Sequence, residues 1–277
     1  MLKTRILTAV PLVILVLGLV WWADSHWLRA GLLLLGLLGA WEWARLCGLQ
    51  RPIERGFYAV LVGLVLLLLW SVGAADGHRP SIWAIPAVLW WLGMLLMLIA
   101  WSRRPERRAP PVSMRLMAGL VTLGFAWLGL AALHARGSAG PFWMTLCFLL
   151  VWGADIGAYF AGRRYGRRRL APAVSPGKTW EGVLGGLGLA LVLALGAAWG
   201  GRALGVAVPG LAWLLPVTTL VVAASVVGDL SESLLKRWAG VKDSGDILPG
   251  HGGVLDRVDA LLAAAPVLAA ALTGLQA

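Results

Sequence analysis

The last polar stretch of the chain, residues 228–259, concentrates side chains that suit phosphate chemistry. It holds six acids and four bases among several glycines, and an apolar segment lies on either side of it. Carboxylates can hold Mg²⁺, which usually keeps several waters and takes phosphate oxygens as further ligands. Lysine and arginine form charge-assisted hydrogen bonds with phosphate. A charged stretch between two apolar segments therefore indicates a site for a phosphorylated ligand.

Spacing places the acids of this stretch on two helix faces. Asp229, Glu232 and Lys236 stand at i, i+3 and i+7, which is one face of a helix that continues from the preceding apolar segment. Asp256 and Asp259 stand at i and i+3, at the start of the last apolar segment. Carboxylates from two helix ends that face one cavity would hold Mg²⁺. The alternative is that these acids only form ion pairs on helix surfaces.

The residues between the two helices add further phosphate-binding groups. Lys236, Arg237 and Lys242 can neutralise a triphosphate. Glycines at positions 250, 252 and 253 let backbone amides approach an anion or a ribose. His251 between them can bind phosphate or transfer a proton. A flexible loop followed by a helix cap is the alternative interpretation.

Two upstream segments carry polar residues in unusual positions. Asp155 lies inside the apolar run VWGADIGAYFAG, where a carboxylate is costly and usually functional, although pairing with a nearby arginine is the alternative. In SPGKTWEG, residues 175–182, we expect a turn at positions 176–177, after which Lys178 and Thr179 begin a helix. Donors at a helix N-terminus suit an anion, and a simple helix cap by Thr179 is the alternative. The pattern GxxxxGK[ST] is absent because position 172 is proline.

The elements that must position these residues are membrane-spanning helices. Of the 277 residues, 60% are hydrophobic and 13% are charged, and the mean hydropathy is +0.81. A span needs about 20 apolar residues, so we predict an all-α, polytopic integral membrane protein with about nine transmembrane helices. The predicted spans are 6–22, 30–47, 57–74, 82–101, 116–134, 142–162, 181–200, 211–228 and 258–275. No small-residue cleavage site follows the first run, so we expect a retained span rather than a signal peptide.

Charge is distributed unequally between the two ends of these spans. Twenty of the 24 lysines and arginines fall in alternate loops, which the positive-inside rule places in the cytoplasm together with the N-terminus. The net charge of +11 thus reflects membrane topology, and we expect no nucleic-acid partner because the sequence contains no recognition module. Eight of the thirteen acids lie in the second half, near loops of the arginine-rich side. We therefore predict an N-terminal helical bundle at 1–140 and a catalytic transmembrane region at 141–277, with its site facing the cytoplasm.

The polar segments carry a family resemblance. SLLKRWAGVKDSGDILPGHGGVLDRVD resembles the signature of the phosphatidate cytidylyltransferases, also called CDP-diacylglycerol synthases. The upstream blocks WGAD, GAYFAGRRYG, SPGKTWEG and GDLSES are similar to family blocks and follow in the same order. The resemblance covers residues from about 150 to 260, and the N-terminal half is similar only in being a hydrophobic bundle. Ile156 departs from the family pattern, which has a small or hydroxylated residue there.

The resemblance implies that CTP and phosphatidate react to give CDP-diacylglycerol and pyrophosphate, with Mg²⁺, alone or beside a second cation, as cofactor. It implies contact with membrane lipids, a homodimer, and an inner-membrane location with the site on the cytoplasmic side. The implied catalytic residues are Asp229, Lys236, Asp256 and Asp259, with the metal held by Asp229, Asp256 and Asp259. The implied substrate-binding residues are Asp155, Ser175, Lys178, Thr179, Glu232, Arg237, Lys242, Asp243, His251, Gly252, Gly253 and Arg257. Among these, Asp155 would line the cavity that the lipid headgroup enters.

Three other functions must be distinguished from this one. A CDP-alcohol phosphotransferase also uses aspartates and Mg²⁺, but its motif order DG…AR…G…D…D is absent. A CTP-dependent polyprenol or phytol kinase is closer in chemistry, and activity on those alcohols would distinguish it. A transporter of an anionic lipid or solute would have broken helices in two matched halves, whereas the acids here cluster at one face.

Overall fold

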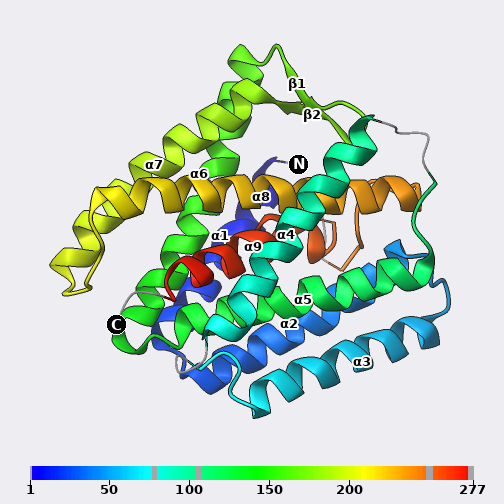
Figure 1. The fold of residues 1–277 in the computed structure, drawn as a ribbon, viewed down its shortest axis with the longest axis horizontal. Helices are drawn as coiled ribbons and strands as arrows, with labels where there is room; N and C mark the ends of the chain where they lie inside the picture. Colours follow the sequence, from blue (N-terminus) through cyan, green and yellow to red (C-terminus); the bar gives the residue numbers. More distant parts are fainter. Residues whose placement is uncertain (1, 77–79, 104–107, 248–251, 274–277) are drawn as a thin grey trace.

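The computed structural model describes residues 2–76, 80–103, 108–247 and 252–273 (Figure 1). Within these ranges an α-helix occurs at each of the nine predicted spans. The helices are α1 Leu2–Trp22, α2 Ser25–Leu46, α3 Pro52–Ser71, α4 Pro80–Arg103, α5 Val112–His134, α6 Gly140–Tyr165, α7 Trp180–Ala203, α8 Leu211–Ala239 and α9 Leu255–Ala271. A short 3₁₀ helix, η1 Gly137–Ala139, precedes α6. The predicted all-α architecture is confirmed, apart from one short hairpin.

Six of these helices are long and apolar enough to cross a membrane, namely α3, α4, α5, α6, α7 and α8. Exposed leucines such as Leu61, Leu64 and Leu96 give α3 and α4 the apolar outer face that lipid requires. α9 has only 17 residues, against the roughly 20 that a span needs. α8 continues past residue 228 to Ala239, as the spacing of its acids predicted. The chain is therefore a polytopic helical membrane protein.

The central element of the bundle is α9. In Figure 1 it lies in the middle of the molecule, in red, between α8 and α5. It also packs against α2, α4 and α6. The alanines at positions 263–265 are fully buried, and on α5 a Cβ at Gly129 would lie 2.5 Å from the nitrogen of Pro266. Small side chains thus let five helices surround the element that carries Asp256 and Asp259.

α6 and α7 form a close pair along one side of the bundle (Figure 1). Small residues let their backbones approach: a Cβ at Gly157 would lie 2.5 Å from the carbonyl oxygen of Gly185. Gly185 in turn packs directly against Ala161. Such small residues at the contact are typical of helices that pack closely within a membrane.

A β-hairpin joins α6 to α7 and corrects one prediction. Its strands, β1 Arg169–Ala171 and β2 Ser175–Thr179, are antiparallel. The turn lies at residues 172–174 rather than at positions 176–177, and it is closed by a 3.1 Å hydrogen bond from Val174 N to Ala171 O. Proline fixes φ at a value that an edge strand tolerates, so Pro176 can lie within β2. The expected turn residues are therefore extended, and they lead straight into α7.

Candidate functional site

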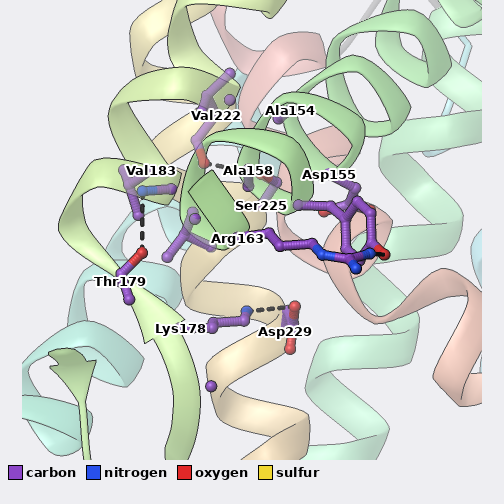
Figure 2. A pocket seen from close by; sticks show the side chains of 16 residues that line it. Ala154, Asp155, Ala158, Arg163, Lys178, Thr179, Val183, Val222, Ser225 and Asp229 are labelled. Carbon is purple, nitrogen blue, oxygen red and sulfur yellow. Dashed lines mark hydrogen bonds and ion pairs between the residues drawn. The ribbon is translucent and has the colours of Figure 1, made fainter. Parts of the chain in front are cut away.

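A cavity of about 430 Å³ lies between α6, α7, α8 and the end of β2 (Figure 2). Small or apolar side chains such as Ala158, Val183 and Val226 make up much of its wall. Its polar lining comes from three elements: Asp155, Tyr159 and Arg163 on α6, Lys178 and Thr179 on β2, and Ser225 and Asp229 on α8. The cavity thus gathers four of the predicted site residues. Apolar walls with a few convergent charges suit a ligand that has a charged head and an apolar body.

Lys178 and Asp229 form an ion pair in this cavity, between β2 and α8 (Figure 2). Each side chain is 27% exposed, so the pair is partly shielded from water. Asp155 interacts electrostatically with both of them. Asp229 also accepts a 3.3 Å hydrogen bond from Ser233 Oγ, one turn further along α8. A lysine that is paired with one carboxylate at a cavity wall is well placed to bind phosphate oxygens instead.

The junction between β2 and α7 holds Lys178 in position. Thr179 caps α7, because its Oγ1 accepts a 3.1 Å hydrogen bond from Gly182 N, which confirms the helix-cap interpretation. Glu181 accepts hydrogen bonds at 3.0–3.2 Å from the backbone amides of residues 167 and 168. Both contacts fix the base of the hairpin against the start of α7. Lys178 therefore extends from a rigid junction rather than from a loose loop.

Sequence reasoning missed several residues that line the cavity. Arg163 Nη1 donates a 2.9 Å hydrogen bond to Tyr159 Oη, and both residues lie on the wall formed by α6. The signal was present, since Asp155, Tyr159 and Arg163 stand at i, i+4 and i+8 on one helix face. Ser225 precedes Asp229 by four residues in the same way.

A second polar cluster surrounds Asp256 at the start of α9. Lys236 Nζ lies 2.7 Å from Asp256 Oδ1 and 2.6 Å from Glu232 Oε2. Asp256 Oδ2 accepts hydrogen bonds from Ser244 N at 2.9 Å, Ser244 Oγ at 3.0 Å and Gly253 N at 2.9 Å. Burial raises the pKa of Asp256, but the hydrogen bonds from the lysine and the two backbone amides outweigh it and hold the pKa below its usual range. Both oxygens of this carboxylate are therefore used by protein donors.

Asp259 and Glu232 lie between the two clusters. Asp259 interacts electrostatically with Asp229 and Glu232, but Asp259 is not in the lining of the cavity that holds Asp229. The helices cross closely here, since a Cβ at Gly228 would lie 2.5 Å from the carbonyl oxygen of Asp259. Glu232 is 1% exposed and pairs with Lys236, and within the described part of the chain its two carboxylate oxygens accept no further hydrogen bond. The ion pair with Lys236 Nζ thus leaves hydrogen-bonding capacity on the buried Glu232 carboxylate.

The binding of Mg²⁺ stays a prediction. Within the described residues, no group of three or more His, Cys, Asp or Glu side chains has metal-binding geometry. Of the three predicted ligands, Asp256 has both oxygens committed to protein donors. Asp229 and Asp259 interact with one another, and Asp229 lines the cavity. Since Mg²⁺ is often held by one or two carboxylates and substrate phosphates, this pair fits a metal that binds together with a nucleotide.

Several other predicted residues are not in the cavity lining. Ser175 lies in β2 but not in the cavity lining. Arg237 Nε donates a 3.1 Å hydrogen bond to Val174 O, which ties α8 to the hairpin. Three charged residues are exposed to solvent: Lys242, Asp243 and Arg257.

The glycine-rich segment before α9 encloses Asp256. Gly252 has φ of +78°, a conformation that favours glycine, and a Cβ there would lie 2.8 Å from Asp256 Oδ2. Gly253 donates its amide to the same oxygen. The amide predicted to meet an anionic ligand thus meets a protein carboxylate in this structure. His251 lies outside the described residues.

Sequence reasoning also missed Glu42 on α2. Its carboxylate is 1% exposed and accepts 2.9 Å hydrogen bonds from Ser244 Oγ, Val254 N and Leu255 N. The signal was available, because Glu42 lies inside the apolar run LLGAWEWARL just as Asp155 lies inside its own. The N-terminal bundle therefore reaches the segment that holds Asp256.

Comparison with known proteins identifies the family. The model of the cytidylyltransferase family matches residues 3–275, which is nearly the whole chain. The chain belongs to the cytidylyltransferase family. This cytidylyltransferase is 42% identical to the phosphatidate cytidylyltransferase of Pseudomonas aeruginosa, over 98% of this chain and 97% of that protein. It is 38% identical to the enzyme of that name from Haemophilus influenzae, over 96% of each chain, and 37% identical to that of Brucella suis, over 96% of this chain and 92% of that one.

The match extends beyond the signature blocks. The blocks covered residues from about 150 to 260 and gave the N-terminal half no likeness beyond a hydrophobic bundle. The cytidylyltransferase family model begins at residue 3 and therefore includes that half.

Proposed function

We propose that this cytidylyltransferase transfers the cytidylyl group of CTP to phosphatidate, giving CDP-diacylglycerol and pyrophosphate for phospholipid synthesis. The observation that carries the proposal is the cavity in which Lys178 and Asp229 meet between apolar helix faces, in a chain of this family. The names of three relatives that are similar over nearly their whole length support the choice of substrates.

The proposed reaction needs little covalent chemistry from the protein. The phosphate of phosphatidate is ionised at neutral pH, so one of its oxygens attacks the α-phosphorus of CTP without a strong base. A bond forms between that oxygen and the α-phosphorus, the bond from the α-phosphorus to the bridging oxygen breaks, and pyrophosphate leaves. Positioning and charge neutralisation then lower the barrier. Lys178 provides positive charge at the cavity, and the apolar wall accommodates the lipid.

The proposal includes Mg²⁺, with a second cation as a further possibility from the family resemblance. Asp229 and Asp259 would hold the ion, which would neutralise charge on the nucleotide phosphates. Asp155 lies on the wall beside them, where the lipid headgroup would enter. In the assignment from the resemblance, Asp256 is also a ligand, and that role requires it to release donors that it holds here.

We further propose an inner-membrane enzyme whose active site faces the cytoplasm, where CTP is available. The unequal distribution of lysine and arginine supports this orientation. The family resemblance supports a homodimer, and light scattering from the active protein in detergent tests it. If an active preparation has the mass of a monomer, a dimer is not required for activity.

A single assay tests the reaction. Purified protein is incubated with phosphatidate in mixed micelles, Mg²⁺ and CTP labelled at the α-phosphorus, and we expect labelled CDP-diacylglycerol together with pyrophosphate. Chelation of the metal should stop the reaction, and added Mg²⁺ should restore it. A folded preparation that forms no CDP-lipid contradicts the proposal. Transfer of the γ-phosphate to polyprenol or phytol would instead favour the kinase alternative.

A further inference from the structure

Glu42 connects the N-terminal bundle to the catalytic region through a buried carboxylate. It lies near the end of α2, and its Oε1 accepts the amide of Val254 while its Oε2 accepts the amide of Leu255, both at 2.9 Å. Leu255 is the first residue of α9. The first amides of a helix have no partner within the helix and usually obtain one from a nearby capping residue. Here the cap comes from another helix, more than 200 residues earlier in the chain.

The segments on both sides of α9's start are shaped around this carboxylate. A Cβ at Gly245 would collide with Glu42 Oε1, and a Cβ at Gly253 would collide with Glu42 Oε2. Nearby on α2, Arg45 Nη1 donates a 3.4 Å hydrogen bond to Ser244 O and lies 3.6 Å from Asp246. A single helical turn of α2, from Glu42 to Arg45, thus contacts both residues 244–246 and residues 253–255. Such close enclosure indicates a specific contact rather than a side chain buried by chance.

One hydroxyl group links Glu42 to the acid that sequence reasoning placed in the active site. Ser244 Oγ lies 2.9 Å from Glu42 Oε2 and 3.0 Å from Asp256 Oδ2, and Ser244 is fully buried. A hydroxyl has one proton to donate, so it lies between two acceptors that compete for it. Asp256 is in turn paired with Lys236 on α8. The chain of contacts therefore runs from α2 through Ser244 and Asp256 to α8.

We infer that Glu42 is a positioning residue for cytidylyl transfer. From α2 it fixes the start of α9, and so sets where Asp256 and Asp259 lie relative to Asp229. This inference rests on the proposed function. It gives the N-terminal bundle a task in the reaction without placing Glu42 in contact with substrate. Glu42 is not in the lining of the cavity that holds Lys178, so its removal should affect turnover more than binding of the lipid.

The test compares Glu42→Gln with wild type. Glutamine keeps the size of the side chain, but it has one acceptor oxygen and adds an NH₂ donor that faces backbone amides. We expect kcat for CDP-diacylglycerol formation to fall about 10- to 100-fold, the range typical of residues that orient an active-site group. The KM for phosphatidate should stay within about twofold. Amide hydrogen exchange, followed by mass spectrometry, should become faster at residues 244–247 and 252–256 but not in α3 or α5.

Glu54→Gln is the matched control. Glu54 also caps a helix, since its Oε2 accepts a 3.4 Å hydrogen bond from Arg51 N at the start of α3, but this helix contributes nothing to the cavity. We expect wild-type kcat and wild-type exchange at residues 244–247 and 252–256. Ser244→Ala is a second variant that removes the linking hydroxyl and leaves α2 intact, and it should lower kcat in the same direction.

The outcomes separate this inference from the proposed function. If wild type forms no CDP-lipid, the function fails, while the exchange data still report whether Glu42 fixes the start of α9. If wild type is active and Glu42→Gln keeps wild-type kcat, the positioning role is excluded. If exchange in Glu42→Gln rises throughout α2, α5 and α9, the substitution has lowered the stability of the whole bundle. The kcat of Ser244→Ala then becomes the test of the positioning role. Wild-type kcat in that variant would then overturn the inference.

Discussion

Asp229 on α8 and Asp256 on α9 belong to neighbouring acidic clusters, but the protein satisfies the two carboxylates to different extents. Asp256 receives Lys236 on one oxygen and three donors on the other. Asp229 receives Lys178 and one 3.3 Å hydrogen bond from Ser233, and it lines the cavity. We name the group of Asp155, Lys178 and Asp229 the cavity cluster. The group of Glu42, Lys236, Ser244 and Asp256 is the anchor cluster.

The difference indicates a division of labour. A buried carboxylate with a full set of donors is stabilised where it lies. Its removal therefore lowers the free energy of unfolding. A carboxylate that is paired with one lysine at a cavity wall can change partners when a phosphorylated ligand or a metal arrives. Substitutions in the cavity cluster should therefore affect turnover, and substitutions in the anchor cluster should affect stability as well.

The largest effect on activity is expected for Asp229→Asn. The substitution keeps the shape of the side chain but removes a charge from the cavity, so kcat/KM for CTP should fall by at least about 100-fold, as when one electrostatic contact of a transition state is deleted. The thermal midpoint of unfolding in detergent should change little. The control is Asp24→Asn at the start of α2, where asparagine caps a helix as well as aspartate does. Activity within a few-fold of wild type in Asp229→Asn would show that the cavity cluster is not the reaction centre.

Asp256→Asn should separate the two clusters in stability. Lys236 and the three donors on Oδ2 lose a charged acceptor when the carboxylate becomes an amide, and we expect the free energy of unfolding to fall by about 2 kcal/mol. Thermal unfolding of the purified variants in one detergent gives the comparison. The midpoint of Asp256→Asn should lie clearly below that of Asp229→Asn. If the midpoint of Asp229→Asn were the lower one, Asp256 would be the carboxylate that can change partners, and its donors would contribute little to stability.

The sequence predicts the helices well because each long apolar run is a local property. The positions of the nine helices and the continuation of α8 both follow from spacing within a single segment. The hairpin was missed because Pro176 and Gly177 suggest a turn when read alone. Their pairing with β1 depends on a second segment, which local reading does not include.

The site was predicted in part for the same reason. Asp155, Lys178 and Asp229 each stood out within their own segment, and the structure gathers them in one cavity. The state of Asp256 was not predictable, because its environment depends on Ser244 and through it on Glu42, which is 202 residues away from that serine. Which carboxylates are satisfied is a property of long-range packing. Local spacing shows which acids share a helix face, but not which donors reach them.

The smallest effect on activity is expected at the edge of the cavity cluster. Arg163 and Arg164 are neighbours in the sequence, but only Arg163 lines the cavity. Arg163 lines the cavity and donates to Tyr159, whereas the Arg164 guanidinium lies over the Tyr165 ring, 5.3 Å from its centroid, outside the cavity lining. One arginine near an anionic lipid surface contributes about 1 kcal/mol, so Arg163→Ala should raise the KM for phosphatidate about fivefold and leave kcat unchanged. Initial rates in mixed micelles at fixed CTP measure both constants.

Arg164→Ala is the control for this prediction, because it removes the same charge from the same helix end. We expect its KM to stay near that of wild type. Equal increases in both variants would mean that the arginines attract anionic lipid to the surface in general, and the cavity cluster would then end at Asp155. An increase for Arg163→Ala alone would extend the cluster by one residue along α6, to a group that meets the lipid before Lys178 does.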